Sequence, residues 1–385
     1  MYNFDKMTDR SDTLSYKWDV KDGELPMWVA DMDFPVAEPI KEAICKRAEH
    51  GIFGYTYAPS EYFESVSEFY GRNHNFEIPT EQMVYSNGVV AAISSMVRKL
   101  TTPAEKVLIQ APVYNIFYNS ILNNGRVVLS SDLVYENGEY HIDFADLEEK
   151  MADKQTSLMI LCNPHNPIGK IWCKQELTKI GDLAKKYGVT VISDEIHCDI
   201  TKPGVDYVPF ASVSDVCADI SVTCIAPSKT FNIAGLQSAV VYAKNPILRH
   251  KVFRGINTDE VGEPNAFSMQ AGIAAYTECD EWVRQMRKYV FENKALVEEY
   301  IEKNIPELHV VPSDATYLSW IDISRVSGDS VEFTEKLRAE TGLYLNDGAE
   351  YGECGRAFVR MNLGTQRERV LDGLKRLERF VKALK

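Results

Sequence analysis

Five short apolar segments recur through the middle of the chain, and several are nearly continuous in Val, Ile and Leu. Strands that are covered on both faces have this composition, whereas half-exposed strands alternate apolar and polar residues. An amphipathic stretch over 174–188, which closes on a glycine stop, is the clearest of the helical patterns between them. The alternation predicts an α/β fold in which helices cover both faces of a mostly parallel sheet. The segments are 106–112, 156–164, 189–197, 220–229 and 238–243.

The pattern changes after about residue 280. A long helical stretch over roughly residues 266–304 is followed by short β-like segments that alternate with helices, as in a separate α+β domain. These are strands over 308–312, 316–323 and 356–363, a helix near 331–341 and a final helix. We therefore expect an N-terminal arm and part of the small domain over 1–45, a large domain over 46–280 and the C-terminal small domain over 281–385.

Length and charge narrow the class of protein. The 385 residues are 45% hydrophobic and 25% charged, which is usual for a globular chain with one large and one smaller domain. The net charge of −14 argues against nucleic acid or an anionic membrane as the main partner. No run is long enough to cross a bilayer, and residues 1–19 lack the apolar core of a signal peptide. We expect a cytoplasmic protein.

The 8 cysteines are scattered along the chain without a CxxC pair. This spacing argues against a zinc ribbon or a redox dithiol, and we expect no metal site. Cys162 and Cys224 lie inside apolar segments, where cysteine commonly serves as a small core residue.

Lys229 stands just past the end of a predicted buried strand. Most lysines in such a position extend to solvent, because burial of the charged amine is costly. The alternative is a desolvated lysine of lowered pKa, which can form a Schiff base with an aldehyde. Lys229 by itself leaves both interpretations open.

Unusual residues also follow the other predicted strands at their carboxyl ends, namely Tyr114, Asn163–Pro167 and Asp194–His197. Ligands of open α/β sheets bind at this edge, so we expect these residues to converge around Lys229. A pyridoxal phosphate site requires a lysine amine, a carboxylate for the pyridine nitrogen, a donor for the ring oxygen and a flat side chain against the ring.

Each of these residues has an ordinary structural interpretation as well. Asp194 alone would be a helix cap or an ion-pair partner, and Asn166 alone would be a turn residue between prolines. His197 and Tyr114 would be packed core side chains. At one sheet edge, Asp194 becomes a candidate for the pyridine nitrogen and Asn166 for the ring oxygen. Gly88 precedes a predicted helix, where backbone amides can approach a phosphate.

Eight motifs occur in the same order as in a known family and span nearly the whole chain. The chain resembles fold-type I, class I/II aminotransferase-like proteins, and more narrowly the bacterial cystathionine β-lyase (MalY/PatB-type carbon–sulfur lyase) family. The motifs are 27-MWVADMDFP-35, 51-GIFGYTY-57, 86-SNGVV-90, 111-APVYNIFY-118, 163-NPHNPIGK-170, 193-SDEIHCDI-200, 227-PSKTFNIAGLQ-237 and 358-FVRMNLGTQR-367.

The resemblance implies a pyridoxal 5′-phosphate enzyme with a seven-stranded, mostly parallel sheet in its large domain. Lys229 would hold the cofactor and later move the Cα proton of the substrate. Tyr55 would reach in from a neighbouring subunit, which implies a homodimer, and Arg360 would bind the substrate α-carboxylate through two parallel hydrogen bonds.

The resemblance also implies the remaining contacts of the site. For the cofactor they are Asp194 at the pyridine nitrogen, Asn166 and His197 at the ring oxygen, Tyr114 against the ring, and Gly88, Val89, Val90 and Ser228 at the phosphate. For the substrate they are Ala30, Asp31 and Asn166, and Tyr55 and Tyr114 are expected to assist catalysis beside Lys229.

Two positions differ from the usual aminotransferase pattern. Aminotransferases of this kind commonly have a tyrosine at the position of His197 and an arginine eight residues after the lysine, where this chain has Gln237. Both differences, and the motif MWVADMDF, resemble the lyase branch.

The expected reaction is α,β-elimination of L-cystathionine or a related cysteine S-conjugate to a thiol such as homocysteine, pyruvate and ammonia. One alternative is transamination, in which Lys229 would return the proton to the cofactor. Another is a protein of this fold with an additional role in binding a transcription regulator. A dinucleotide-binding enzyme is disfavoured, because no GxGxxG follows the first strand.

Overall fold

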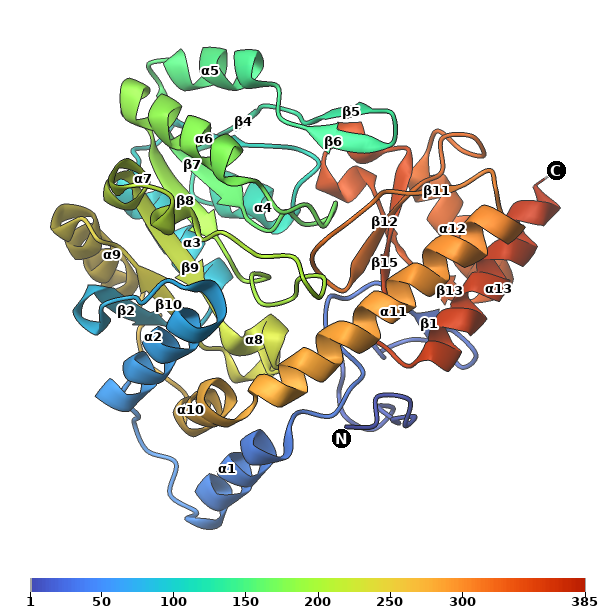
Figure 1. Cartoon of the computed structure of the whole chain (residues 1–385), viewed down its shortest axis with the longest axis horizontal. Helices are drawn as coiled ribbons and strands as arrows, with labels where there is room; N and C mark the ends of the chain where they lie inside the picture. The colour runs from blue at the N-terminus through green and yellow to red at the C-terminus, as the bar shows by residue number, and fades with distance from the viewer. Residues whose placement is uncertain (1, 385) are drawn as a thin grey trace.

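The computed structural model describes residues 2–384, and its largest element is a seven-stranded sheet of order β2-β10-β9-β8-β7-β3-β4 (Figure 1). Only β10 runs against its neighbours, β2 and β9, while the other paired strands are parallel. The predicted α/β fold is therefore confirmed. The strands are β2 Met83–Ser86, β3 Lys106–Ile109, β4 Val127–Ser130, β7 Thr156–Cys162, β8 Thr190–Asp194, β9 Ser221–Ile225 and β10 Ala239–Tyr242.

Both faces of this sheet are buried, which explains why its strands are apolar at consecutive positions. On β7, Leu158, Ile160 and Cys162 pack on one face, and Met159 and Leu161 pack on the other. The first face is covered by α3 Val89–Leu100, α4 Ile116–Leu122 and α9 Pro246–Thr258. The second is covered by α2 Ser60–His74, α5 Phe144–Ala152, α6 Lys174–Tyr187, α7 Asp215–Ile220 and α10 Ser268–Glu278, with α1 Glu38–Glu49 against α10.

A four-stranded antiparallel sheet of order β11-β12-β15-β14 forms the second core. Leu25 of the N-terminal arm pairs with Leu343 and is buried in this core. The expected domain boundaries at residues 45 and 280 stay a prediction. The elements are β11 His309–Val310, β12 Leu318–Asp322, β14 Asn346–Asp347, β15 Phe358–Asn362, the pair β1 Leu25–Pro26 and β13 Leu343–Tyr344, α12 Ser330–Thr341, α13 Arg367–Ala383, and a separate hairpin of β5 Val134–Glu136 and β6 Glu139–His141.

The long helical stretch expected over 266–304 is two helices, α10 and α11 Asp280–Asn304. Cys279 leaves the helical conformation at φ −112° and ψ 13°, and its buried thiol donates to the carbonyl of Ala274. Asp280 and Glu281 then begin a new first turn, where acidic side chains are favoured. In Figure 1, α11 (orange) runs from beside α10 to the second sheet and so contacts both parts of the molecule.

None of the helices within residues 2–384 combines the length and apolarity that crossing a bilayer requires.

Candidate active site

A cavity of about 560 Å³ lies at the carboxyl ends of the parallel strands. Its volume is within the range of small-molecule and cofactor sites. Ten of the residues expected at the site line it, although they come from six separate segments of the chain. They are Ala30, Gly88, Val89, Val90, Tyr114, Asn166, Asp194, His197, Ser228 and Lys229.

Lys229 lies in α8 Pro227–Thr230, a single helical turn directly after β9. Its side chain does not extend away to solvent, because Nζ donates to the carbonyl of Ala30 at 2.6 Å. Burial, together with the charge of Arg360, lowers the pKa of the amine from 10.5 to about 8. About a tenth of the amine is then neutral at pH 7, compared with about 0.03% for an ordinary lysine. A lysine with this neutral fraction has the protonation state that a nucleophilic amine requires at neutral pH.

Asp194 and His197 are buried near Lys229. Asp194 ends β8, accepts a hydrogen bond from the amide of Ile196 at 3.1 Å, and has its pKa raised to about 7 by burial. A cation placed in the cavity would favour the carboxylate form of Asp194. Burial and the positive charges of Lys229 and Arg360 lower the pKa of His197 to about 3, so its ring is neutral. Nδ1 of His197 is buried and finds no hydrogen-bond partner in the described part of the chain.

Arg360 approaches the same region from β15 of the second sheet, although it does not line the cavity as bounded above. Its Nη1 donates to Asn166 Oδ1 at 3.2 Å, and its Nη2 donates to Asn346 Oδ1 at 2.8 Å and to the carbonyl of Trp28 at 2.9 Å. Nε is buried without a partner among residues 2–384. Three of the five N–H donors of the guanidinium are therefore engaged and fix its orientation, while Nε–H and one N–H of Nη1 have no partner among the described residues, as expected for a carboxylate-binding group.

The amino end of α3 supplies backbone donors to the cavity. Val89 and Val90 begin this helix, and the amides of a first helical turn have no partner within the helix itself. Gly88 precedes them at φ +155° and ψ 153°, a conformation that other residues rarely adopt. Ser228 faces the same cavity from α8. This end of the cavity suits an anionic group such as a phosphate.

Two further residues of the expected site do not line the cavity in the single chain. Tyr55 is fully exposed and borders a separate surface cavity. Asp31 is adjacent to Ala30, but Arg10 binds its carboxylate through two hydrogen bonds of 2.8 and 3.1 Å. The sequence did not predict that Arg10 pairs with Asp31. The two residues are twenty-one positions apart in an irregular segment, where no helix or strand periodicity relates them.

The structure adds residues that the sequence analysis missed. Asn232 makes three hydrogen bonds with the backbone of Met32 and Phe34, and Tyr317 donates to the carbonyl of Ala30 at 2.8 Å. Together with Asn346 beside Arg360, they hold the N-terminal arm and the arginine against the cavity. Asn232 at least carried a signal, because it lies within the PSKTFNIAGLQ motif.

The chemistry of this cavity fits pyridoxal phosphate. A lysine amine of lowered pKa, a buried carboxyl group, a neutral histidine ring and a helix amino end lie around one space. These are the groups that an aldehyde, a pyridine nitrogen, a ring oxygen and a phosphate each require.

The low pKa of Lys229 predicts a distinct pH dependence in the cofactor-free protein. Only the neutral amine reacts with acetic anhydride, so labelling of Lys229 should rise about tenfold per pH unit and level off near pH 8. Exposed Lys41, whose pKa is raised by Glu38, should continue to rise above pH 10 in the same sample. Trace labelling followed by peptide mass spectrometry measures both. A midpoint above pH 10 for Lys229 would contradict the prediction.

The chain belongs to the aminotransferase class I and II family, whose model matches residues 28–377. It is 41% identical to cystathionine β-lyase PatB of Bacillus subtilis over 98% of this chain and 99% of that protein. It is 30% identical to protein MalY of Escherichia coli, with full coverage of both chains. The crystal structure of cystalysin from Treponema denticola, which contains a pyridoxal 5′-phosphate cofactor, matches with a TM-score of 0.96, 32% identity and full coverage of both chains. The expected family and fold type are confirmed.

Proposed function

We propose that this protein is a pyridoxal-phosphate-dependent carbon–sulfur β-lyase. It cleaves L-cystathionine or a related cysteine S-conjugate to a thiol, pyruvate and ammonia. The observation that carries the proposal is the pairing of a lysine of lowered pKa with a buried carboxyl group in one cavity. The similarity to a cystathionine β-lyase over nearly the whole chain supports this choice of reaction.

Pyridoxal 5′-phosphate is the cofactor, and when bound it withdraws electrons from the substrate Cα. Lys229 holds it covalently, and Asp194 binds the pyridine nitrogen. His197 and Asn166 bind the ring oxygen, and Tyr114 covers the ring. The phosphate is bound by the amino end of α3 and by α8, through Gly88, Val89, Val90 and Ser228.

Arg360 and Asn166 bind the substrate α-carboxylate, and the unused Nε of Arg360 supplies the additional donor. Ala30 and Asp31 border the substrate from the N-terminal arm. When it is not attached to the cofactor, Lys229 would serve as the base for the Cα proton, because its lowered pKa leaves part of the amine neutral. Lys229 removes that proton, and the electron pair left on Cα forms the Cα–Cβ double bond as the Cβ–S bond breaks. The sulfur leaves as a thiolate.

The experiment that tests this function follows the purified protein with L-cystathionine and S-methyl-L-cysteine. Lyase activity releases pyruvate and free thiol in equal amounts, which a coupled dehydrogenase assay and a thiol reagent measure. Keto acid formation that requires an added amino acceptor, without free thiol, would instead assign the protein to the aminotransferases. No turnover of either kind after addition of pyridoxal phosphate would overturn the proposal.

The protein acts as a homodimer in which Tyr55 completes the site of the partner. Tyr55 is fully exposed in the single chain, and Ile52, Phe53 and Tyr57 of the same segment are more than half exposed. A group of large exposed apolar side chains of this kind usually marks a contact with another protein. The adjoining surface cavity of about 890 Å³, bordered by Phe253 as well as Tyr55, extends the same face.

Mixing two inactive variants tests the shared site. Tyr55→Ala is expected to lower activity about 100-fold, and Lys229→Ala to abolish it. In a mixed dimer, Lys229 of the Tyr55→Ala subunit meets the intact Tyr55 of the other subunit. When equal amounts of the two variants exchange subunits at random, half of the dimers are mixed. Each mixed dimer has one intact site out of two, so about a quarter of wild-type activity should return. Activity no higher than the mean of the two variants would place Tyr55 outside the partner's site.

A further inference from the structure

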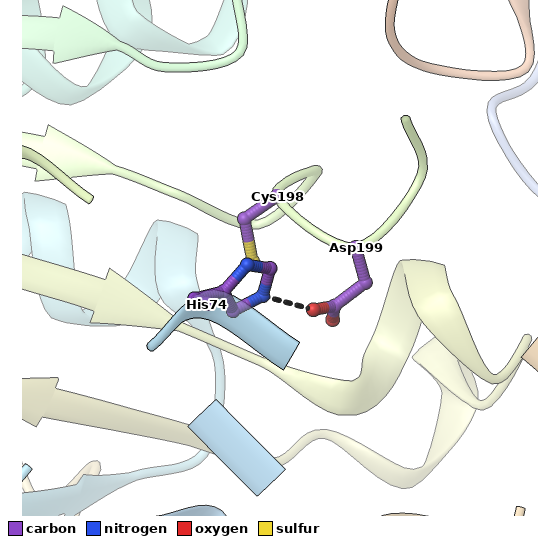
Figure 2. Close-up of side chains that lie close together, drawn as sticks. All are labelled: His74, Cys198 and Asp199. Atoms are coloured by element: carbon purple, nitrogen blue, oxygen red, sulfur yellow. Dashed lines mark hydrogen bonds and ion pairs between the residues drawn. The ribbon is translucent and has the colours of Figure 1, made fainter. Parts of the chain in front are cut away.

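A second cluster of ionisable side chains lies outside the cavity of the proposed active site. His74 ends α2, and Cys198 and Asp199 follow His197 in the turn after β8. One imidazole nitrogen, the sulfur and one carboxylate oxygen lie within 4.8 Å of one another (Figure 2). They border a cavity of about 310 Å³ that, within residues 2–384, shares no lining residue with the first. The proposed reaction uses none of the three.

Hydrogen bonds already engage the polar atoms of this cluster. His74 Nε2 lies 2.6 Å from Asp199 Oδ1, and Thr230 Oγ1 donates to Asp199 Oδ2 at 2.7 Å. Cys198 Sγ lies 2.9 Å from the hydroxyl of Tyr70, and burial together with the Asp199 carboxylate raises the pKa of the thiol well above 9. A metal would require the thiolate and would displace His74 from Asp199. The contacts therefore favour a hydrogen-bonded network over a metal centre.

Asp199 joins three segments that are far apart in the sequence. Its own turn begins at Asp194 and includes His197, so it carries two of the proposed cofactor contacts. Through Thr230 it binds α8, which carries Lys229, and through His74 it binds the carboxyl end of α2. One buried carboxylate thus fixes the distance between the segment of Asp194 and the segment of Lys229.

The segment of Lys229 needs such a contact because α8 is only four residues long. A single turn gains little stability from its own hydrogen bonds, so tertiary contacts set its orientation. Thr230, the next residue after Lys229, is fully buried and can anchor the backbone of α8. The side chain of Lys229 is held at Nζ, by the carbonyl of Ala30. A rotation of α8 would displace Nζ of Lys229 from the cavity.

We propose that Thr230, Asp199 and His74 are positioning residues that hold Lys229 in the orientation required for cofactor attachment and proton transfer. This inference rests on the proposed function of Lys229. Thr230 acts directly on α8, Asp199 connects it to the segment of Asp194, and His74 holds Asp199 from the second cavity.

Substitution of Thr230 tests the network. Thr230→Val keeps the shape of the side chain but removes the hydroxyl, and it should lower kcat about 10- to 100-fold with KM within about threefold, because Arg360 is untouched. Thr230→Ser keeps the hydroxyl and should retain kcat within about threefold. A second measurement does not use turnover: cofactor-free protein is mixed with pyridoxal phosphate, and the return of visible absorbance is timed. Thr230→Val should be at least about fivefold slower than Thr230→Ser.

A double-mutant cycle with His74→Phe separates a network from independent structural defects. If His74 acts through Asp199 on Thr230, the double variant should be no slower than Thr230→Val alone, whereas independent effects would multiply. Multiplied effects, or equal rates for Thr230→Val and Thr230→Ser, would overturn the proposal. The proposal would also be overturned if the purified wild-type protein contained one equivalent of zinc and the Cys198→Ser variant contained none. If the wild-type protein binds pyridoxal phosphate but cleaves no substrate, the lyase function is wrong. The positioning role would still be decided by the rates at which pyridoxal phosphate reattaches to wild-type protein, Thr230→Val and Thr230→Ser.

Discussion

Lys229→Ala is expected to reduce carbon–sulfur lyase activity by about 10⁴-fold or more. In the proposed reaction, Lys229 would supply both the covalent link to the cofactor and the base that takes the Cα proton, so one substitution would remove both contributions. Added pyridoxal phosphate should then leave the protein on gel filtration, because the remaining contacts hold it only reversibly. Pyruvate release and the visible absorbance of the filtered protein measure the two effects.

The chain offers a matched control in Lys294, a second lysine with a strongly lowered pKa. Burial lowers the pKa of Lys294 to about 7, and its Nζ donates to Ser313 Oγ and to the carbonyls of Ala315 and Leu318. Lys294→Ala removes these three hydrogen bonds from a buried position and should lower the free energy of unfolding by about 2–4 kcal/mol. The cofactor should nevertheless remain attached. Loss of the cofactor from both variants alike would show that Lys229→Ala acts through stability, contrary to the prediction.

Asp194→Asn should have the second largest effect, a fall in kcat of about 10³-fold. The amide has the same shape as the carboxyl group but carries no negative charge, so it cannot keep a pyridine nitrogen protonated. A bound ring would then withdraw electrons from Cα less strongly, and removal of the Cα proton by Lys229 would become slower. The KM for the substrate should change little, because the proposed contact of Arg360 with the carboxylate does not involve Asp194. Steady-state kinetics with saturating pyridoxal phosphate measure both constants.

Glu195, the next residue in the chain, provides the control for Asp194→Asn. It is also buried, which raises its pKa to about 7, but it accepts from Ser193 Oγ and from the amide of Phe210 and does not line the cavity. Glu195→Gln should retain kcat within about fivefold. If the two amide substitutions reduce kcat equally, then the loss comes from a buried carboxyl group in general and not from a contact of Asp194 with the cofactor.

The sequence by itself determined five of the seven strands of the large sheet, all except β2 and β4, and most of the residues around the cavity. Strands buried on both faces must be apolar at consecutive positions, so Thr156–Cys162 and Ser221–Ile225 were identifiable without structural information. Because parallel strands end at one edge, residues placed after them, such as Asp194 and Lys229, were expected to converge, and both line the cavity.

The tertiary structure alone decided how distant side chains pair. Nothing in the sequence near Arg360 predicts that Asn346 and Asn166 orient its guanidinium, or that Asp199 binds both His74 and Thr230. The break of the long helix at Cys279 also escaped the pattern, because apolar residues continue on both sides of it. Hydrophobic periodicity specifies which face of an element is buried, whereas hydrogen bonds between segments depend on how the elements are arranged in space, which no local pattern encodes.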